Sequence, residues 1–243
     1  MMYIDAREGL SGDMLVAAML HLLEERQRRD AASRIEKAAA LHSLAFTISE
    51  VDEDGDRGLA VNYHLAQPIV TEESYDGAFS LLEEYENHLG SHGTVGRLIL
   101  KAIFEAEGEA HWIPPEQVHL HEIGRPQGIL NMAAIGLLSH MLVDDGGEGF
   151  VASKIVTGKG MTVMSHGAVR IPPPAARALL KGLRHEEGEA LGERATPTGI
   201  AALKILTKSQ TNMMPVNHFD RKGVGFGSKR FGGRLGRTVI YRY

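Results

Sequence analysis

Residues 3–26 read YIDAREGLSGDMLVAAMLHLLEER, and this stretch decides the fold class. Tyr3–Asp5 has the character of a short strand, and a loop follows it. Apolar and small side chains then recur at helical spacing, at Leu15, Ala18, Met19 and Leu22. This spacing predicts a helix that runs to about Arg26, with Ser11 as its N-cap. A strand that leads through a loop into a helix indicates a chain that mixes the two element types.

Outward from this stretch, helix and strand patterns alternate to the end of the sequence. Helices are expected at 33–41, 73–89, 94–111, 128–143, 172–182 and 196–208. Strands or extended segments are expected at 45–51, 59–65, 118–124, 150–156, 161–164, 213–216, 223–226 and 237–242. Both hairpins and helix crossovers occur, which predicts an α/β chain of the mixed α+β kind, with mixed sheets and packed helices.

The loop at 144–149 is the best candidate for a domain boundary. We therefore expect an N-terminal α/β part over residues 1–145 and a C-terminal α/β part over residues 146–243. One continuous domain is the alternative.

Composition narrows the classes of function. The chain has 243 residues, of which 43% are hydrophobic and 23% charged, so it can bury a sizeable core. It has no cysteine, which excludes disulfides, thiolate metal sites and cysteine nucleophiles. A net charge of -5 argues against a nucleic-acid partner. We see no apolar run of about 18 residues and no basic leader before an apolar stretch. We therefore expect no membrane partner and a cytoplasmic location.

The first candidate site contains two histidines in a short extended segment. On a strand, His119 and His121 face one side and Leu120 the other. Two imidazoles on one face are half of a site for a transition metal. Glu122 would join them if the chain turns at Gly124. The alternative is two partly buried histidines that are hydrogen-bonded to backbone or carboxylate groups.

Two helix starts are separate candidates for binding an anion. The first start contains Ser11, Gly12 and Asp13, and the second contains Thr196 and Thr198 around Pro197. A helix start presents free backbone N–H groups and a positive dipole end, which suit a phosphate or carboxylate. Asp5 and Asp13 would instead suit a cation. Ordinary helix capping is the remaining alternative for both segments.

The C-terminal stretch is basic and rich in glycine. Residues 221–243 contain no acidic residue and seven basic ones, at Arg221, Lys222, Lys229, Arg230, Arg234, Arg237 and Arg242. Six glycines lie between Gly223 and Gly236. Glycine allows close approach to a ligand, and arginine binds phosphate in a fork geometry. The alternative is a basic surface that balances an acidic chain.

Several segments together resemble the LarC-type nickel-insertion family. They are Ser11–Met14, Ala106–His111, Val118–Gly124, His166–Ala175, Thr196–Gly199 and Gly223–Gly227, which are similar to its SGDM, AEA-x-x-H, VHFHEVG, HG-x-x-P-x-P-A, TPTG and GYGAG-like segments. The resemblance spans nearly the whole chain. It implies a nickel cyclometallase, or a subunit of one, that inserts nickel into pyridinium-3,5-bisthiocarboxylic acid mononucleotide to make the nickel-pincer cofactor.

The resemblance also implies roles for particular residues. His119, His121 and Glu122 would hold or deliver nickel, and His166 is a candidate for the base that removes a ring proton. The residues expected to bind the mononucleotide are Ser11, Gly12, Asp13, Thr196, Thr198, Arg230 and Arg234.

The sequence departs from the family pattern in three respects, one of which is that it has no counterpart of the family's HRH segment. Gln127 and Asn131 stand where the family has aspartates, and their spacing places them on one helix face. The swap removes two negative charges from the expected metal site. We also expect this chain to contain only the family's N-terminal part. The CTP that is associated with the family's C-terminal part would then be bound only if a further C-terminal part or a partner polypeptide supplies the site. The alternative is that this chain is a degenerate relative of the family, which binds a metal or a phosphorylated or nucleotide ligand without catalysis.

Overall fold

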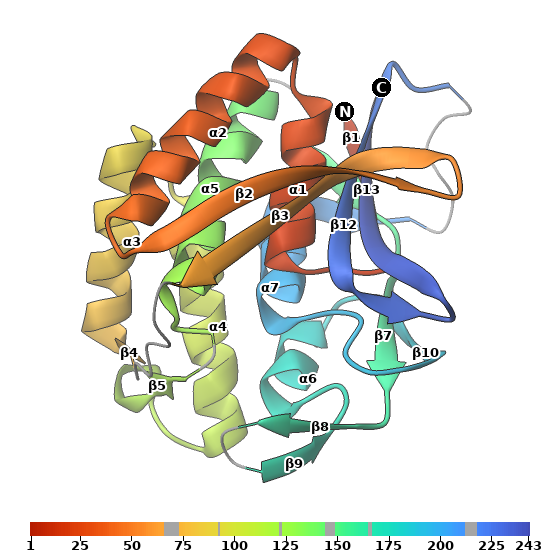
Figure 1. Ribbon diagram of the computed structural model, residues 1–243. Coiled ribbons are helices and arrows are strands. Elements are labelled where there is room, and N and C mark those ends of the chain that lie inside the picture. The colour runs from red at the N-terminus through yellow and green to blue at the C-terminus, as the bar shows by residue number, and fades with distance from the viewer. Residues whose placement is uncertain (66–72, 92, 122, 144–148, 165–166, 212–217) are drawn as a thin grey trace.

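A computed structural model describes the chain except for residues 66–72, 92, 122, 144–148, 165–166 and 212–217 (Figure 1). The helices in the described residues are α1 (Gly12–Leu22), α2 (Glu25–Ala40), α3 (Tyr75–Leu89), α4 (Val95–His111), α5 (Pro126–Leu142), α6 (Pro174–Leu180) and α7 (Pro197–Leu206), with a 3₁₀ turn at Pro115–Gln117. The large sheet contains β1 (Met2–Asp5), β2 (Leu44–Glu53), β3 (Asp56–Leu65), β6 (Phe150–Ala152), β11 (Thr207–Gln210), β12 (Arg221–Phe231) and β13 (Arg234–Arg242). Smaller pairs join β4 (Glu73–Ser74) to β5 (His119–Leu120), β7 (Ile155–Lys159) to β10 (His185–Leu191), and β8 (Met161–Met164) to β9 (Gly167–Arg170).

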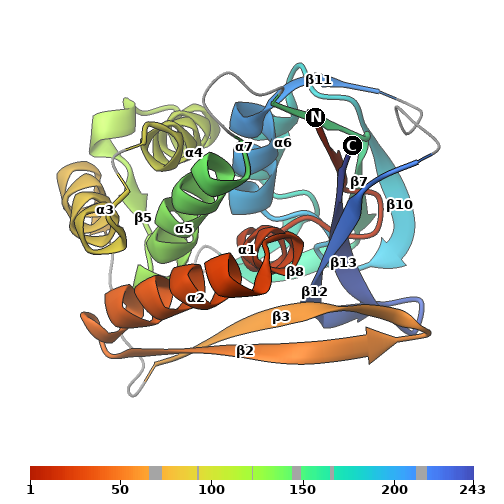
Figure 2. The same ribbon diagram turned by 90° about the horizontal axis from the view of Figure 1, so that it is seen from above.

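The large sheet is mixed, in the order β11-β6-β1-β13-β12-β3-β2. It curves around α1, and α5 lies on the far side of that helix (Figure 2). The mixed α/β class predicted from the sequence is therefore confirmed. Strands from both predicted parts alternate in this one sheet, so we propose a single continuous domain. No helix in the described part of the chain is long and apolar enough to cross a membrane.

The first helix is shorter than its periodicity predicts. It ends at Leu22 rather than near Arg26, because Leu23 and Glu24 are extended, and α2 starts at Glu25. Residues 24–30 are all polar, so no change in the spacing of apolar residues reveals the break between α1 and α2.

The β2–β3 hairpin is longer than predicted, because its connection is only a two-residue turn. Asp54 and Gly55 form the turn, and both have positive φ, 54° and 83°. An Asp-Gly pair is favoured in such turns because its backbone twist matches that of the paired strands. The predicted seven-residue loop at 52–58 is therefore wrong, and the hairpin carries charged residues out to its tip.

A serine interrupts the strand predicted at 150–156. The Ser153 hydroxyl accepts the Ala6 N–H at 2.9 Å, and the Ser153 N–H donates to the Ile4 carbonyl at 2.9 Å. The chain leaves the large sheet after β6 and continues as β7 in a separate pair. The predicted strand at 213–216 lies outside the described residues.

The glycines of the C-terminal segment lie in a strand that packs on α1. Gly223, Gly225 and Gly227 alternate along β12, so they share one face. A Cβ added at Gly225 would lie 1.9 Å from the Met14 carbonyl oxygen, and one at Gly223 would lie 2.2 Å from the Ala18 oxygen. The strand predicted at 223–226 is therefore confirmed as part of β12, and these glycines allow helix and strand backbones to approach closely.

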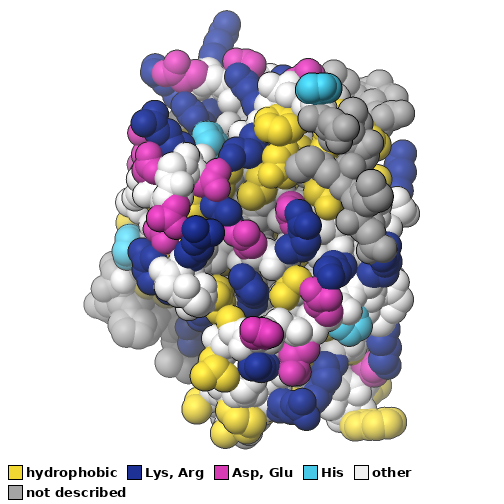
Figure 3. All heavy atoms as spheres, turned by 90° about the vertical axis from the view of Figure 1, so that its right-hand side faces the viewer, with side chains coloured by type: hydrophobic (Ala, Val, Ile, Leu, Met, Phe, Trp, Pro, Cys, Tyr) yellow, Lys and Arg dark blue, Asp and Glu magenta, His cyan; other side chains and the backbone are white. Residues whose placement is uncertain are grey.

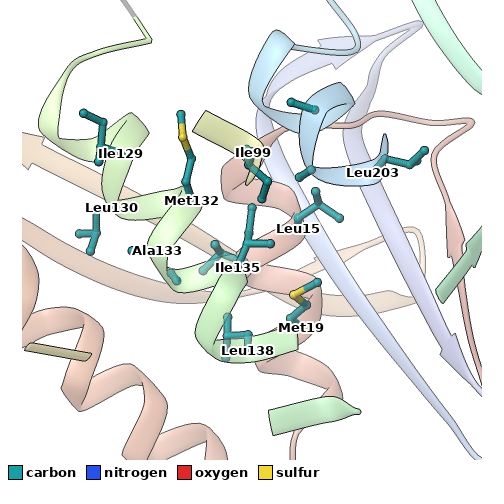
Figure 4. Close-up of a cluster of buried hydrophobic side chains, with 14 of the residues drawn as sticks. Leu15, Met19, Ile99, Ile129, Leu130, Met132, Ala133, Ile135, Leu138 and Leu203 are labelled. Carbon is teal, nitrogen blue, oxygen red and sulfur yellow. The ribbon is translucent and has the colours of Figure 1, made fainter. Parts of the chain in front are cut away.

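The core surrounds α5, which is buried on nearly every face, as its sequence predicts. Figure 4 shows side chains of α5 next to Leu15 and Met19 of α1, Ile99 of α4 and Leu203 of α7. Because α5 contacts helices on several sides, its first turn is held in a fixed position. That turn reaches the site described below.

One buried carboxyl group makes stability depend on pH. Burial raises the pKa of Glu86 on α3 to about 7, Arg97 opposes the shift and Glu83 adds to it. In the folded state Glu86 therefore keeps its proton up to about pH 7, whereas an ordinary glutamate loses its proton near pH 4.5. Stability should fall as pH rises between these values.

We expect Glu86→Gln to remove this dependence. From pH 4 to pH 8, the free energy of unfolding of the variant should rise by about 3 kcal/mol relative to that of the wild type. Urea unfolding across this range measures it, with exposed Glu36→Gln on α2 as the control. A difference that stays constant with pH would contradict the burial argument.

Candidate functional site

Two loops that are far apart in the sequence lie side by side and bring two helix starts together. Leu10 and Ala195 form a parallel bridge. The Leu10 N–H donates to the Arg194 carbonyl at 3.0 Å, and the Thr196 N–H donates to the Leu10 carbonyl at 2.9 Å. Ser11 and Thr196, the residues before α1 and α7, therefore become neighbours.

Both residues act as N-caps, as predicted. The Ser11 hydroxyl accepts the Met14 N–H at 3.4 Å, and the Thr196 hydroxyl accepts the Gly199 N–H at 3.3 Å. A Cβ at Gly199 would lie 2.5 Å from the Leu10 oxygen, so only glycine permits this close contact. The N–H groups in the first turn of each helix have no carbonyl acceptor within the helix.

These helix starts line a cavity of about 210 Å³, which we call the main cavity. Its lining is Ser11, Gly12, Asp13, Ile123, Gln127, Gly128, Asn131, Thr162, Glu193, Thr196, Pro197 and Thr198. The start of α5 contributes Gln127 to Asn131, so three helix starts meet around one space. Five of the predicted ligand-binding residues come together here, namely Ser11, Gly12, Asp13, Thr196 and Thr198.

The polar groups around the main cavity offer both acceptors and donors. The Tyr63 hydroxyl donates to Asn131 Oδ1 at 2.8 Å. Burial raises the pKa of Tyr63, and the charge of Asp13 adds to the shift, so this hydroxyl keeps its proton. Gln127 Oε1 is buried and has no hydrogen-bond partner among the described residues. Together with the carboxylate of Glu193, these oxygens suit a cation or a donor on a ligand.

Neither histidine of the predicted metal site is among the residues that line the main cavity. His119 is exposed, Leu120 is buried and His121 is half-buried, which agrees with the predicted alternation. The chain reaches the cavity lining at Ile123, two residues after His121. Within the described ranges, no group of three or more His, Asp or Glu side chains is placed to hold a metal.

Two of the predicted site residues, Glu122 and His166, lie outside the described residues. The metal site and the catalytic base therefore stay predictions.

Arg230 and Arg234 lie elsewhere, on β12 and β13, where they pair with acidic residues at the tip of the β2–β3 hairpin. Arg230 Nη1 is 2.7 Å from a Glu53 carboxylate oxygen, and Arg234 Nε is 3.0 Å from one of Asp54. Arg230 is the main cause that lowers the pKa of Glu53. Figure 3 shows the face on the right of Figure 1, where basic and acidic side chains are interspersed. Neither arginine lines the main cavity, and their role as phosphate ligands stays a prediction.

Sequence reasoning missed Glu193, Arg194 and Thr162 as site residues. Glu193 and Arg194 lie three and two residues before the predicted cap Thr196, which is a local signal that points to them. Thr162 has no such signal, because its position depends on how the β8–β9 hairpin folds back.

Comparisons with known proteins agree in their result. A family model described as "Nickel insertion protein" matches residues 2–237. A "Putative nickel insertion protein" of Pelobacter propionicus is 30% identical over 243 residues, which cover 94% of this chain and 57% of the relative. One of Geotalea daltonii is 31% identical over 237 residues, covering 95% of this chain and 57% of the relative.

A further relative has a more specific name. It is the "Pyridinium-3,5-bisthiocarboxylic acid mononucleotide nickel insertion protein" of Staphylococcus saprophyticus, and it is 25% identical over 228 residues. The aligned part covers 93% of this chain and 55% of that relative. No solved structure matches this chain. The chain thus spans little more than half the length of these relatives.

Proposed function

Because the chain belongs to the nickel insertion protein family, we propose that it binds a pyridinium mononucleotide with two thiocarboxylate groups and takes part in inserting nickel into it. The observation that carries this proposal is the main cavity, where the starts of α1, α5 and α7 meet. A pyridinium-3,5-bisthiocarboxylic acid mononucleotide has three anionic groups, the two thiocarboxylates and the phosphate. Helix starts and hydroxyl groups suit such groups.

Nickel is a substrate in this reaction. Ni²⁺ accepts imidazole and carboxylate ligands, so His119 and His121 and, in the cavity wall, Asp13 and Glu193 are the groups proposed to guide it. Gln127 and Asn131 add neutral amide oxygens. The thiocarboxylate sulfurs of the organic substrate would then take the metal over.

A base is needed at one step. When the metal–carbon bond forms, the C–H bond of the ring breaks and its proton must go to an acceptor. His166 remains the base proposed from the sequence. Asp13 and Glu193 are the carboxylates that line the cavity in the described part of the chain, and either is an alternative acceptor.

We further propose that CTP and its binding site come from the part of the relatives that this chain does not cover, supplied either as a further C-terminal part or by a partner polypeptide. The reaction should then need both parts. This chain would supply the site for the pyridinium substrate, and the uncovered part would supply the nucleotide.

Reconstitution tests the proposed function. The purified chain is mixed with Ni²⁺ and the bisthiocarboxylate mononucleotide, with and without CTP and the uncovered C-terminal part of a relative. We expect a product whose mass shows one nickel gained, formed only in the complete mixture. Asp13→Asn should lower its rate by about tenfold or more, as expected when one proton-transfer or binding group is lost, whereas exposed Asp30→Asn should not.

Two other outcomes have clear meanings. Binding of substrate and nickel without insertion, even in the complete mixture, would support the non-catalytic alternative, which the comparisons do not favour. No binding of either would refute the proposed function.

A further inference from the structure

A second cavity of about 140 Å³ opens next to the main cavity. Ser11, Asp13, Glu193 and Thr196 line both of them, so the two spaces meet at the starts of α1 and α7. Residues found only in the second cavity are Met14, Arg194, Gly227, Ser228, Lys229 and Phe231. We call this space the basic cavity, because it is lined by Arg194 and Lys229, two cationic residues that do not line the main cavity.

Arg194 is held in place at the wall of the basic cavity. Its guanidinium lies over the Phe231 ring, 5.3 Å from the ring centroid. A Cβ added at Gly188 would lie 3.6 Å from Arg194 Nη1, so strand β10 also covers the guanidinium group. Its Nε is buried and has no hydrogen-bond partner within the described ranges. An unpaired buried donor is unfavourable, and a bound anion would satisfy it.

Lys229 and Ser228 complete the cationic wall at the end of β12. Lys229 Nζ is 3.9 Å from the nearest Glu193 carboxylate oxygen, and 60% of the lysine side chain is exposed. Such a long, exposed ion pair contributes little, so Lys229 can turn to an anion at small cost. The exposed Ser228 hydroxyl adds a donor beside it.

The joined cavities therefore have a charge gradient. The carboxylates of Asp13 and Glu193 lie at the junction, and the cationic side chains lie at the outer end. A pyridinium mononucleotide has the matching polarity, because its ring nitrogen is positive and its phosphate negative. The ring would lie at the junction, with its ring substituents in the main cavity.

We propose that the basic cavity is the phosphate subsite for the mononucleotide, formed by Arg194, Ser228 and Lys229 rather than by Arg230 and Arg234. This inference rests on the proposed function, and it adds which end of the substrate enters which cavity. It also assigns the glycine-rich strand β12 an indirect role, since that strand positions the residues that bind the phosphate.

The test compares two ligands that differ only in phosphate. They are nicotinic acid mononucleotide, which is a pyridinium mononucleotide with one carboxylate, and the corresponding nucleoside. By calorimetric titration, the wild-type chain should bind the nucleotide about tenfold to a hundredfold more tightly, because charge-assisted hydrogen bonds are lost without phosphate. Arg194→Gln and Lys229→Gln should each reduce this preference, and nucleoside binding should stay unchanged.

Arg230→Gln and Arg234→Gln are the matched controls, because they remove the same charge from the same C-terminal segment. Lys229 is exposed, so its variant should fold, and thermal unfolding checks that both cavity variants do. Equal wild-type binding of both ligands would overturn the phosphate subsite and leave the proposed function standing. A preference lost in the Arg230 or Arg234 variant, but kept in the Lys229 variant, would also overturn it. Binding of neither ligand would also overturn the phosphate subsite, whereas the proposed function is tested separately with the bisthiocarboxylate mononucleotide.

Discussion

Gly225→Val is expected to prevent stable folding. A Cβ at this position would lie 1.9 Å from the Met14 carbonyl oxygen and 2.6 Å from the Ala18 nitrogen, both backbone atoms of α1. Neither the helix nor the strand can give way, because α1 is enclosed between the sheet and α5. Overpacking of a rigid contact typically costs about 1–3 kcal/mol and can exceed that, and we expect a loss of at least about 3 kcal/mol. Urea unfolding followed by circular dichroism measures it.

Gly227→Ala is the matched control on the same face of the same strand. There the nearest atom to an added Cβ is Met14 Cε at 2.3 Å, the free end of a flexible side chain. Methionine can change rotamer, so this variant should remain folded with a much smaller loss. If Gly225→Val were as stable as the control, the close approach of β12 to α1 would be wrong.

The second large effect is expected from restoring two carboxylates at the main cavity. Gln127→Asp combined with Asn131→Asp should strengthen Ni²⁺ binding by about tenfold to a hundredfold, because charged oxygens hold a divalent cation more tightly than amides. Both side chains line the cavity together with Asp13 and Glu193. Calorimetric titration with Ni²⁺ measures the change.

The same variant should be less stable than wild type without metal. Asn131 is only 8% exposed, so the new carboxylate would be buried near Asp13. Added Ni²⁺ should restore the melting temperature, which links binding to the folded state. Exposed Gln117→Asp is the control for an added charge. An unchanged nickel affinity would mean that the metal does not enter this cavity.

Local sequence rules predicted the two helix starts. Ser11 and Thr196 are N-caps because a short side chain can accept an N–H three residues ahead, and this bond needs nothing from the rest of the fold. The buried helix α5 was equally clear, since apolar and small residues occupy nearly all of its faces. The positions of these elements along the chain were therefore largely correct.

The assembly of the site needed the structure. The bridge between Leu10 and Ala195 joins distant segments, and no local pattern encodes it. The same reason explains why β9 and β10 were missed, because pairing rather than composition forms them. The glycines of β12 had two physical readings, ligand approach and helix packing, and only the neighbouring α1 decides between them.

The order of strands in the sheet has a consequence for the chain while it is being synthesised. β1 pairs with β6 and β13, and among the described strands the β2–β3 hairpin joins the rest of the sheet only through β12. The first strands to be synthesised therefore meet their final neighbours only when the last ones are made, and until then β12 and β13 do not cover their side of α1. Non-local pairing of this kind slows folding and exposes apolar surface. The large sheet should therefore close around α1 only after β12 and β13 have been synthesised.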